Sequence, residues 1–409
     1  MKSKPKTVPD LRFPGFVGAW NRIKLAIAID SIDSGWSPQC SDQPAKPDEW
    51  GILKTTSVVW SGYIEEANKR LLPGFEPREH IEVKARDILI TRAGPSERVG
   101  VVAHVDRTRP MLMLSDKIIR LRCNDLTDSR FIARCISSRE SQDHLLGRKS
   151  GLAKSQTNIS QNDLKSVPLA LPTLPEQRKI AEFLTAVDGR IGQLSQKKAL
   201  LEDYKKGVMQ QLFTQALRFK DDHGNDFPKW EEKTLGDAVI VNPKTSDLPD
   251  SFIYIDLESV NAGVLHSPRR ISKVDAPSRA QRLLKRGDIL YQTVRPYQMN
   301  NYLFDLEGVH VASTGYAQLR ASKTDARFIY HSLHLPRFVG DVMDRCTGTS
   351  YPAINSKDLT QIAISIPSLP EQTKIANFLT ALDRKIESVS QQITHTQAFK
   401  KGLLQQMFV

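Results

Sequence analysis

Apolar residues recur at alternating spacings of four and three residues along two stretches of the chain, 175–216 and 370–408. Pro175 and Pro370 suit the first turn of a helix, and no later proline interrupts either stretch. This spacing is typical of a coiled-coil seam and predicts two long helices that pair antiparallel. The principal seam positions are Ile180, Leu184, Val187, Ile191 and Leu194 in the first stretch and Ile375, Leu379, Leu382, Ile386 and Val389 in the second.

The two stretches are copies of one sequence. LPEQRKIAEFLTAVDGRI at 174–191 and LPEQTKIANFLTALDRKI at 369–386 are identical at 13 of 18 positions, with an offset of 195. The same offset carries KKGVMQQLF (205–213) onto KKGLLQQMF (400–408). The alternative, two unrelated amphipathic helices packed on local cores, does not explain why seam and sequence repeat together.

The segments before the helices are less alike, but both contain short β-rich runs broken by Gly and Pro. ARDILITRAGP (85–95) aligns with RGDILYQTVRP (286–296). The pattern predicts an α+β protein with pseudo-two-fold symmetry, in which globular domains alternate with long helices. We expect globular domains at 1–155 and 222–350 and helix-bearing regions at 156–221 and 351–409.

Composition places the chain among ordinary globular proteins. Of its 409 residues 40% are hydrophobic and 25% charged, and the formal net charge is +12, which favours a polyanionic partner. No apolar run approaches the length of a membrane span and the first residues lack the apolar core of a signal peptide, so we expect a cytoplasmic protein without membrane contact. The four cysteines form no CxxC pair, which argues against a disulfide framework or a zinc cluster.

Basic and amide side chains gather in both variable segments. Arg can grip guanine, Asn and Gln can pair with adenine, and Lys can neutralise phosphate, so these residues are candidates for DNA binding. A basic run is also compatible with a plain solvated surface. The candidates are Lys84, Arg92 and Arg98 in the first segment and Arg269, Arg270, Arg279, Arg295, Tyr297, Gln298 and Asn300 in the second.

Catalytic motifs are not apparent. Asn242-Pro243-Lys244 lacks the aromatic residue of a base-flipping methyltransferase motif, and the stretch from Gly147 to Ser155 does not have P-loop spacing. Pro47-Asp48 with Glu82 and Lys84 matches a loose nuclease pattern, but 82–90 alternates like a strand, which favours a structural role. We therefore expect no catalytic residues, no metal site and no cofactor.

The repeated LPxLPEQxKIAxFLTAxDxxI, the KKGxxQQxF endings and GDILYQTVRPY resemble the specificity subunit of type I restriction-modification systems. The resemblance covers nearly the whole chain. It implies two target-recognition domains, each reading one half of a split site in double-stranded DNA. It also implies conserved spacer helices that bind methyltransferase subunits, two of them in the expected complex. Restriction subunits are further candidate partners, and the catalytic sites for methylation and cleavage are expected in these partner subunits.

The first segment departs from the family pattern at one position. Ala85-Arg86-Asp87 stands where family members commonly carry Gly before Asp, as Arg286-Gly287-Asp288 does. Two other classes of function stay open at this point. One is an enzyme with a catalytic site fused to DNA recognition, and the other is a coiled-coil scaffold that does not read DNA.

Overall fold

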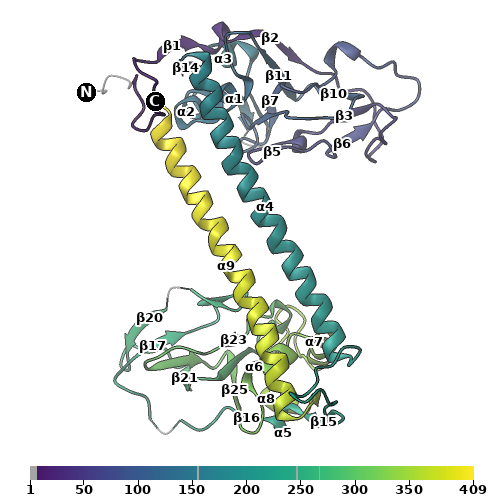
Figure 1. Cartoon of the computed structure of the whole chain (residues 1–409), viewed down its shortest axis with the longest axis vertical. Coiled ribbons are helices and arrows are strands. Elements are labelled where there is room, and N and C mark those ends of the chain that lie inside the picture. Colours follow the sequence, from purple (N-terminus) through teal and green to yellow (C-terminus); the bar gives the residue numbers. More distant parts are fainter. Residues whose placement is uncertain (1–6, 154–155, 246, 267) are drawn as a thin grey trace. The chain divides into compact units, whose positions relative to one another are not determined.

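The computed structural model describes residues 7–153, 156–245, 247–266 and 268–409, and it divides into two compact units. The first unit comprises Met1–Gln193 and Ile393–Val409, and the second comprises Leu194–Gln392. Both contain helices and strands, as expected for an α+β chain (Figure 1). The domain boundaries drawn from the sequence stay a prediction, and the one at residue 155 lies outside the described residues.

The first unit is built on a four-stranded antiparallel sheet flanked by short helices. The order in this sheet is β2-β11-β7-β9, and Ile119 of β11 pairs with Ile90 of β7. Smaller sheets have the orders β10-β3-β6, β12-β13-β8, β1-β14 and β4-β5. The strands are β1 (Asn21–Lys24), β2 (Ile29–Ser34), β3 (Gly51–Leu53), β4 (Val58–Val59), β5 (Gly62–Tyr63), β6 (Asn68–Arg70), β7 (Ile88–Thr91), β8 (Ala93–Gly94), β9 (Val102–His104), β10 (Leu112–Met113), β11 (Ile118–Cys123), β12 (Ser150–Ala153), β13 (Gln156–Asn158) and β14 (Pro168–Leu171), and the short helices are α1 (Ser129–Ser137), α2 (Arg139–Leu146) and α3 (Gln161–Lys165).

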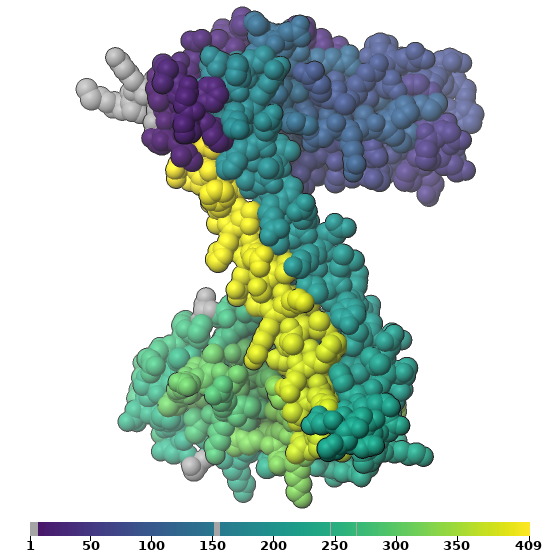
Figure 2. All heavy atoms as spheres, viewed as in Figure 1, coloured from purple at the N-terminus to yellow at the C-terminus, as the bar shows by residue number. Residues whose placement is uncertain are grey.

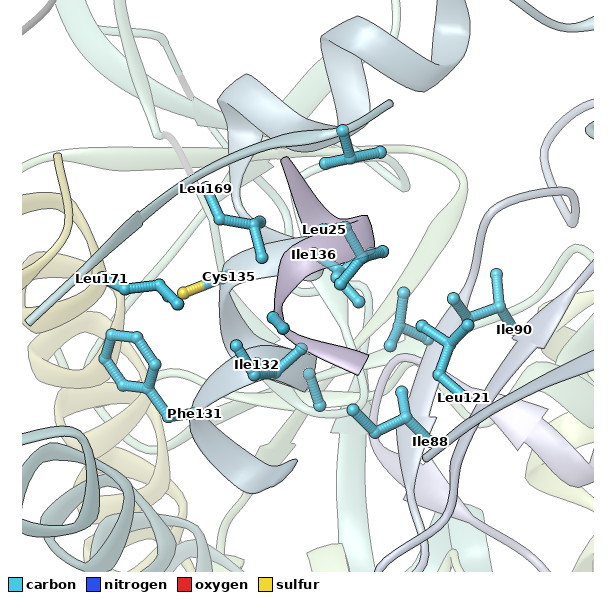
Figure 3. Packing of buried hydrophobic residues seen from close by; sticks show 14 of the residues in the cluster. Leu25, Ile88, Ile90, Leu121, Phe131, Ile132, Cys135, Ile136, Leu169 and Leu171 are labelled. Atoms are coloured by element: carbon cyan, nitrogen blue, oxygen red, sulfur yellow. The ribbon is translucent and has the colours of Figure 1, made fainter. Parts of the chain in front are cut away.

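Helix α1 packs on one face of this sheet. Its apolar residues Phe131, Ile132 and Ile136 all lie in the core, with Ile132 on the side of Ile88 and Phe131 on the side of Leu171 (Figure 3). Asp128 caps the helix by accepting a hydrogen bond from the backbone N–H of Phe131.

The second unit contains two four-stranded sheets, β16-β25-β22-β23 and β20-β17-β24-β21. The first is antiparallel throughout, whereas β17 and β24 in the second are parallel. Two-stranded pairs are β15-β26 and β18-β19. The strands are β15 (Glu231–Thr234), β16 (Val239–Val241), β17 (Ser251–Ile255), β18 (Val260–Asn261), β19 (Val264–Leu265), β20 (Arg269–Ser272), β21 (Ala280–Leu283), β22 (Asp288–Gln292), β23 (Tyr302–Leu303), β24 (His310–Ser313), β25 (Tyr316–Ala321) and β26 (Ala363–Ile366), and the short helices are α5 (Leu235–Ala238), α6 (Ala326–Ser332), α7 (Pro336–Asp344) and α8 (Ser356–Thr360).

Two long helices are present where the apolar spacing predicts them, α4 (Leu174–Phe213) and α9 (Leu369–Met407). Helix α4 ends three residues before the predicted end at 216, because Gln215 adopts a left-handed backbone conformation with φ 61°.

The first three seam positions of each helix serve the core of their own unit. Ile180, Leu184 and Val187 join the core cluster of the first unit, and the equivalent positions of α9 join that of the second. Local packing thus accounts for part of the apolar stripe that the sequence assigns to a coiled-coil seam. The three α9 residues in the core of the second unit are Ile375, Leu379 and Leu382. Of the remaining seam positions, Leu194 and Val389 are buried, and Ile191 and Ile386 are half-buried.

Each unit also contains contacts between the two long helices. In the first unit Leu403 and Met407 of α9 lie in the same core cluster as Leu184, and Lys400 forms an ion pair with Asp188 at 2.6 Å. The described residues near the N-terminus, from residue 7 on, pack against the start of α4 and the end of α9. There the backbone N–H of Leu11 donates to the carbonyl of Gln406 in α9 (Figure 2). The second unit has the equivalent ion pair between Lys205 of α4 and Asp383 of α9, and its core contains Val208 and Leu212 of α4.

The duplication extends to buried polar contacts at the start of each long helix. Glu176, 1% exposed, accepts two hydrogen bonds of 2.7 Å from Arg12. Glu371, fully buried, accepts hydrogen bonds of 3.0 and 2.7 Å from Arg218. The hydrogen bonds and charges of these carboxylates raise the pKa of both arginines. Each helix therefore begins at a paired buried carboxylate near its positive end.

The next residue of each helix holds a short helix in place. Gln177 accepts a hydrogen bond from the backbone N–H of Asp128, the cap of α1, at 3.0 Å. Gln372 accepts the equivalent hydrogen bond from Asp325, the cap of α6, at 2.9 Å. The amide nitrogen of each glutamine donates to a proline carbonyl five residues earlier. The repeated Glu-Gln pair thus fixes the long helix against its own unit.

A tight turn before the central strand is also shared. Arg86 has φ 75° and Gly287 has φ 87°, so the position where the first segment departs from the family pattern keeps the same left-handed conformation. The buried Asp87 and Asp288 close the two turns by accepting hydrogen bonds from backbone N–H groups three residues earlier. Because residues 84–87 form this turn, strand β7 begins at Ile88 and the strand predicted for 82–90 is shorter than expected.

This turn yields a matched pair of stability predictions. Left-handed backbone costs a residue with a Cβ about 1 kcal/mol relative to Gly, so Gly287→Ala is expected to destabilise the protein by that amount. Arg86→Gly removes the same strain and is expected to raise the free energy of unfolding by less than about 1 kcal/mol, because Gly also gains entropy when unfolded. Urea denaturation of the full chain measures both. A loss of stability in Arg86→Gly equal to that in Gly287→Ala would contradict this account of the turn.

Candidate nucleic-acid interface

The clearest candidate site is a loop of the second unit, 293–301, which follows the buried strand β22. A segment at 347–354 supports the loop. Arg295 donates its backbone N–H to Pro352 at 2.7 Å, and Ile354 donates to Thr293 at 3.0 Å. The loop is therefore held by the pairing of β22 with β25, which precedes it, and by its hydrogen bonds with the segment 347–354.

The backbone of the loop is strained in two places. Arg295 and Met299 have φ of 53° and 51°, a conformation that side chains with a Cβ rarely adopt. The turn between them exposes Tyr297 (48%) and Met299 (41%). Strain at exposed, well-supported residues is a feature of functional sites.

The Arg295 guanidinium lies over the ring of Tyr351, 4.4 Å from its centroid. Tyr351 is itself 62% exposed, so the stacked pair faces solvent. Stacking restricts a flexible cation before any ligand arrives. The predicted residue Arg295 is thus presented by a residue that the sequence did not single out.

The other predicted amides are anchored inside the loop. Gln298 accepts a hydrogen bond from the buried Gln292 at 2.9 Å, and Asn300 accepts one from the backbone N–H of Ala262 at 3.0 Å. Gln292 in turn accepts a hydrogen bond from the backbone of Asn300. Arg295, Tyr297, Gln298 and Asn300 therefore belong to one ordered surface, as their spacing suggests.

The remaining arginines predicted for the second unit separate into two places. Arg279 lies near the loop, because its carbonyl accepts from Thr314 and the adjoining Gly315 accepts from Thr293. Arg269 and Arg270 lie on β20, the opposite edge strand of the sheet from β21. All three arginines are exposed, but the structure does not bring the β20 pair together with the loop.

The first unit has an equivalent loop at 92–98, after strand β7. Ile159 donates its backbone N–H to Arg92 at 3.0 Å, which reproduces the contact between Ile354 and Thr293 in the second unit. Strand β8 inside this loop pairs with β13, which precedes helix α3. Each unit therefore joins the end of its central strand to the segment before a short helix, α3 in the first unit and α8 in the second.

The predicted residues of the first loop differ in role. Arg98 donates from its guanidinium to the carbonyls of Thr55 and Val58, at 2.9 and 3.2 Å, and so holds the loop itself. Arg92 is half-buried, with no side-chain partner among the described residues. Lys84 is exposed beside Glu82, at 3.9 Å.

Residues that the sequence analysis missed support the loops. They are Tyr351 and Gln292 in the second unit and Lys149 in the first, whose ammonium donates to the carbonyl of Ser96 at 2.7 Å. Burial lowers the pKa of Lys149. For Tyr351 and Lys149, whose contacts join segments more than 50 residues apart, the one available signal was the alignment of each loop with the stretch preceding the repeat. Gln292 lies only six residues from Gln298.

A second feature occurs in both units, a groove beside the long helices with a volume of about 1010 Å³ in the second unit and 690 Å³ in the first. Six residues that line each groove from the long helices are related by the repeat offset of 195. They are Lys205, Lys206, Met209, Gln210, Phe213 and Asp383 in the second unit and Lys400, Lys401, Leu404, Gln405, Phe408 and Asp188 in the first.

The aspartate of each groove contacts the repeated lysine and one further residue, which differs between the units. Asp188 pairs with Arg134 as well as Lys400, whereas Asp383 pairs with Lys205 and lies 3.9 Å from His331. Burial lowers the pKa of His331 to about 3, so this imidazole is neutral at physiological pH.

Among the described residues no group of three or more His, Cys, Asp or Glu side chains is arranged to hold a metal ion. None of the described helices has an apolar stretch long enough to span a membrane.

Comparison with known proteins matches both halves of the chain to one family model. The type I restriction modification DNA specificity domain matches residues 69–203 and 228–395. The chain is 45% identical over 163 residues to the EcoEI specificity subunit of Escherichia coli, a match that covers 39% of this chain and 27% of that protein. It is 25% identical over 354 residues to the putative MjaX specificity subunit of Methanocaldococcus jannaschii, covering 84% of this chain and 81% of that one.

Solved structures show the same fold. The S subunit of a type I restriction-modification system from M. genitalium superposes with a TM-score of 0.64 at 16% identity, over 98% of this chain and 99% of that one. A chain from a study of complex assembly in a type I system gives a TM-score of 0.51 at 17% identity, over 97% of both chains.

Arg98 and Arg92 provide a test of which predicted residues are structural. Arg98→Ala removes two charge-assisted hydrogen bonds and is expected to lower the free energy of unfolding by about 2 kcal/mol. Arg92→Ala is expected to leave stability within about 0.5 kcal/mol and to weaken binding of duplex DNA at low salt. Urea denaturation and a DNA titration separate the two effects. Equal destabilisation by both substitutions would show that Arg92 is a structural residue too.

Proposed function

Because the chain belongs to the family of type I restriction-modification DNA specificity subunits, we propose that it is the noncatalytic subunit that selects the DNA site of such a complex. The observation that carries this proposal is the duplicated loop. In both units the central strand leads into a loop supported by the segment before a short helix, α3 or α8, and both loops present basic side chains. Two equivalent reading elements suit a site with two halves, one for each unit.

The long helices would act as the spacer between the half-sites. The repeat, the equivalent ion pairs Lys400–Asp188 and Lys205–Asp383, and the contacts of each helix with the other inside both units support an antiparallel coiled coil with pseudo-two-fold symmetry. A helix pair of fixed length keeps the number of unread base pairs constant.

The two grooves would receive two methyltransferase subunits. A site that occurs twice, with the same residues from the repeat, suits two copies of one partner. The exposed Lys206 and Lys401 would attract an acidic segment of that partner. Methylation and cleavage would then belong to the methyltransferase and restriction subunits, in the cytoplasm, and the chain itself would need no cofactor.

The proposed function predicts a split methylation motif. The full chain, co-expressed with its methyltransferase subunits in a host without DNA methylation, is expected to direct modification to two short half-sites with a fixed gap. Arg295→Ala is expected to relax one position of one half-site, at a cost of about 1 to 3 kcal/mol, and to leave the other half unchanged. Sequencing that detects modified bases measures both. A soluble complex that modifies no specific motif would favour a scaffold without DNA readout.

The grooves predict the stoichiometry of the complex. Lys206→Glu places a like charge against the expected acidic segment, and we expect it to reduce the bound methyltransferase subunits from two to one. Lys401→Glu should do the same, and the double variant should bind none. Lys323→Glu, an equal charge change at an exposed residue outside the grooves, serves as the control. Native mass spectrometry counts the subunits, and an unchanged count in the double variant would rule out the grooves as docking sites.

A further inference from the structure

We propose that Arg295, Gln298 and Asn300, on the loop of the second unit, read bases only as hydrogen-bond donors, so that the base positions they contact present acceptor atoms, above all those of guanine. This inference rests on the proposed function and specifies the chemistry of one reading surface. It replaces the expectation that Gln298 and Asn300 pair with adenine through both atoms of their amides. Three amide groups in and beside this loop, those of Gln292, Gln298 and Asn300, are each held in one orientation.

The first amide, that of Gln292, can point only one way. Its nitrogen lies 2.8 Å from the carbonyl oxygen of Val294, which only accepts hydrogen bonds. Its oxygen accepts from the backbone N–H of Asn300 at 3.2 Å. Gln292 is 3% exposed, so reversing this amide would bury two unsatisfied contacts.

The fixed orientation of Gln292 determines that of Gln298. The nitrogen of Gln292 also donates to Gln298 at 2.9 Å, and only the amide oxygen of Gln298 can accept that hydrogen bond. The amide nitrogen of Gln298 donates a hydrogen bond to none of the described residues. Gln298 is exposed, so the atom that it leaves for a ligand is a donor.

Asn300 is oriented in the same way by a separate contact. Its side-chain oxygen accepts from the backbone N–H of Ala262 at 3.0 Å, and a backbone N–H cannot accept in return. Its amide nitrogen has no acceptor among the described residues. A second donor is therefore left for a ligand beside the first.

Arg295 contributes donors only, whichever way it turns. Its guanidinium is stacked over Tyr351, and no carboxylate of the described residues pairs with it. Arg295, Gln298 and Asn300 lie within six positions on one loop and together offer a set of donor-only side chains. The hydroxyl of Tyr297, on the same loop, can donate or accept and is not part of this set.

A set of donor-only side chains discriminates between bases in the major groove. Guanine presents two acceptors, N7 and O6, whereas adenine and cytosine each present an amino donor that would find no acceptor here. Reading adenine with both atoms of a Gln or Asn amide requires the oxygen, which the protein already uses. A base amino group facing the donors of Arg295, Gln298 or Asn300 would lose its hydrogen bonds to water without replacement.

Gln298→Glu tests the inference with the least disturbance. The glutamate keeps an oxygen for Gln292 and replaces the outward donor with an acceptor. Full-length wild type and variant, each with methyltransferase subunits, would select from a randomised duplex pool. We expect one guanine of one half-site to lose its preference in the variant. Gln361→Glu, the same charge change at an exposed residue outside the loop, should select the wild-type motif.

Base analogues then identify the atom that is read. At the guanine affected by Gln298→Glu, 7-deazaguanine removes N7 and should weaken wild-type binding about 5- to 10-fold, the value of one hydrogen bond. The same analogue should change binding of the variant less than 2-fold. Asn300→Asp allows an equivalent test at a second position.

The outcomes separate this inference from the proposed function. If the wild type selects no split motif, the proposed function fails and the inference falls with it. If the wild type selects a split motif but Gln298→Glu alters neither half, the inference alone is overturned. It is also overturned if the altered position is an adenine at which replacement by purine, which lacks the amino group, weakens binding.

Discussion

The buried carboxylate at the start of each long helix is the interaction on which the rest of each unit depends. Glu176 and Glu371 have almost no exposure, and such a charge is costly to bury unless it is paired. The arginine that pairs with each comes from a distant segment, Arg12 for one and Arg218 for the other. The helix, the preceding loop and the arginine-bearing segment are thus joined at one point. Because Gln177 and Gln372 follow directly, the short helices α1 and α6 are positioned from the same point.

The long helices and their duplication could be predicted from the sequence because both depend on local periodicity. A 4,3 spacing and an offset of 195 need no knowledge of tertiary contacts. What the periodicity could not reveal was the partner of each apolar position. Leu184 and Leu379 satisfy the same pattern whether they face another helix or a domain core, and the structure places both in core clusters that also contain residues of the other long helix.

The candidate site could be predicted only as a region. Arg295, Gln298 and Asn300 stood out because arginines and amides are concentrated there, and the structure does gather them on one loop. Composition could not show that Arg98 spends its guanidinium on the carbonyls of Thr55 and Val58, or that Gln292 and Tyr351 set the loop residues in place. The roles of Arg98 and Tyr351 arise from contacts between segments that are remote in sequence, whereas Gln292 contacts Gln298 and Asn300 because the loop turns back on itself. Strained residues such as Arg295 and Met299 are tolerated because the strands around them are rigid.

The ion pairs of the two grooves have a consequence for assembly. Asp188 lies between two cations, Arg134 and Lys400, whereas Asp383 has Lys205 and a neutral His331. Over all the side chains that line the grooves, the first groove has five cations and three carboxylates, a net charge of +2, and the second has three of each, a net charge of 0. Two copies of an acidic partner would meet surfaces of unequal potential, so the first copy would load preferentially on one end. Although the two grooves are repeated in sequence, this difference in charge would order the binding of the two partner copies. The complex with one copy bound would then carry that copy at a defined end.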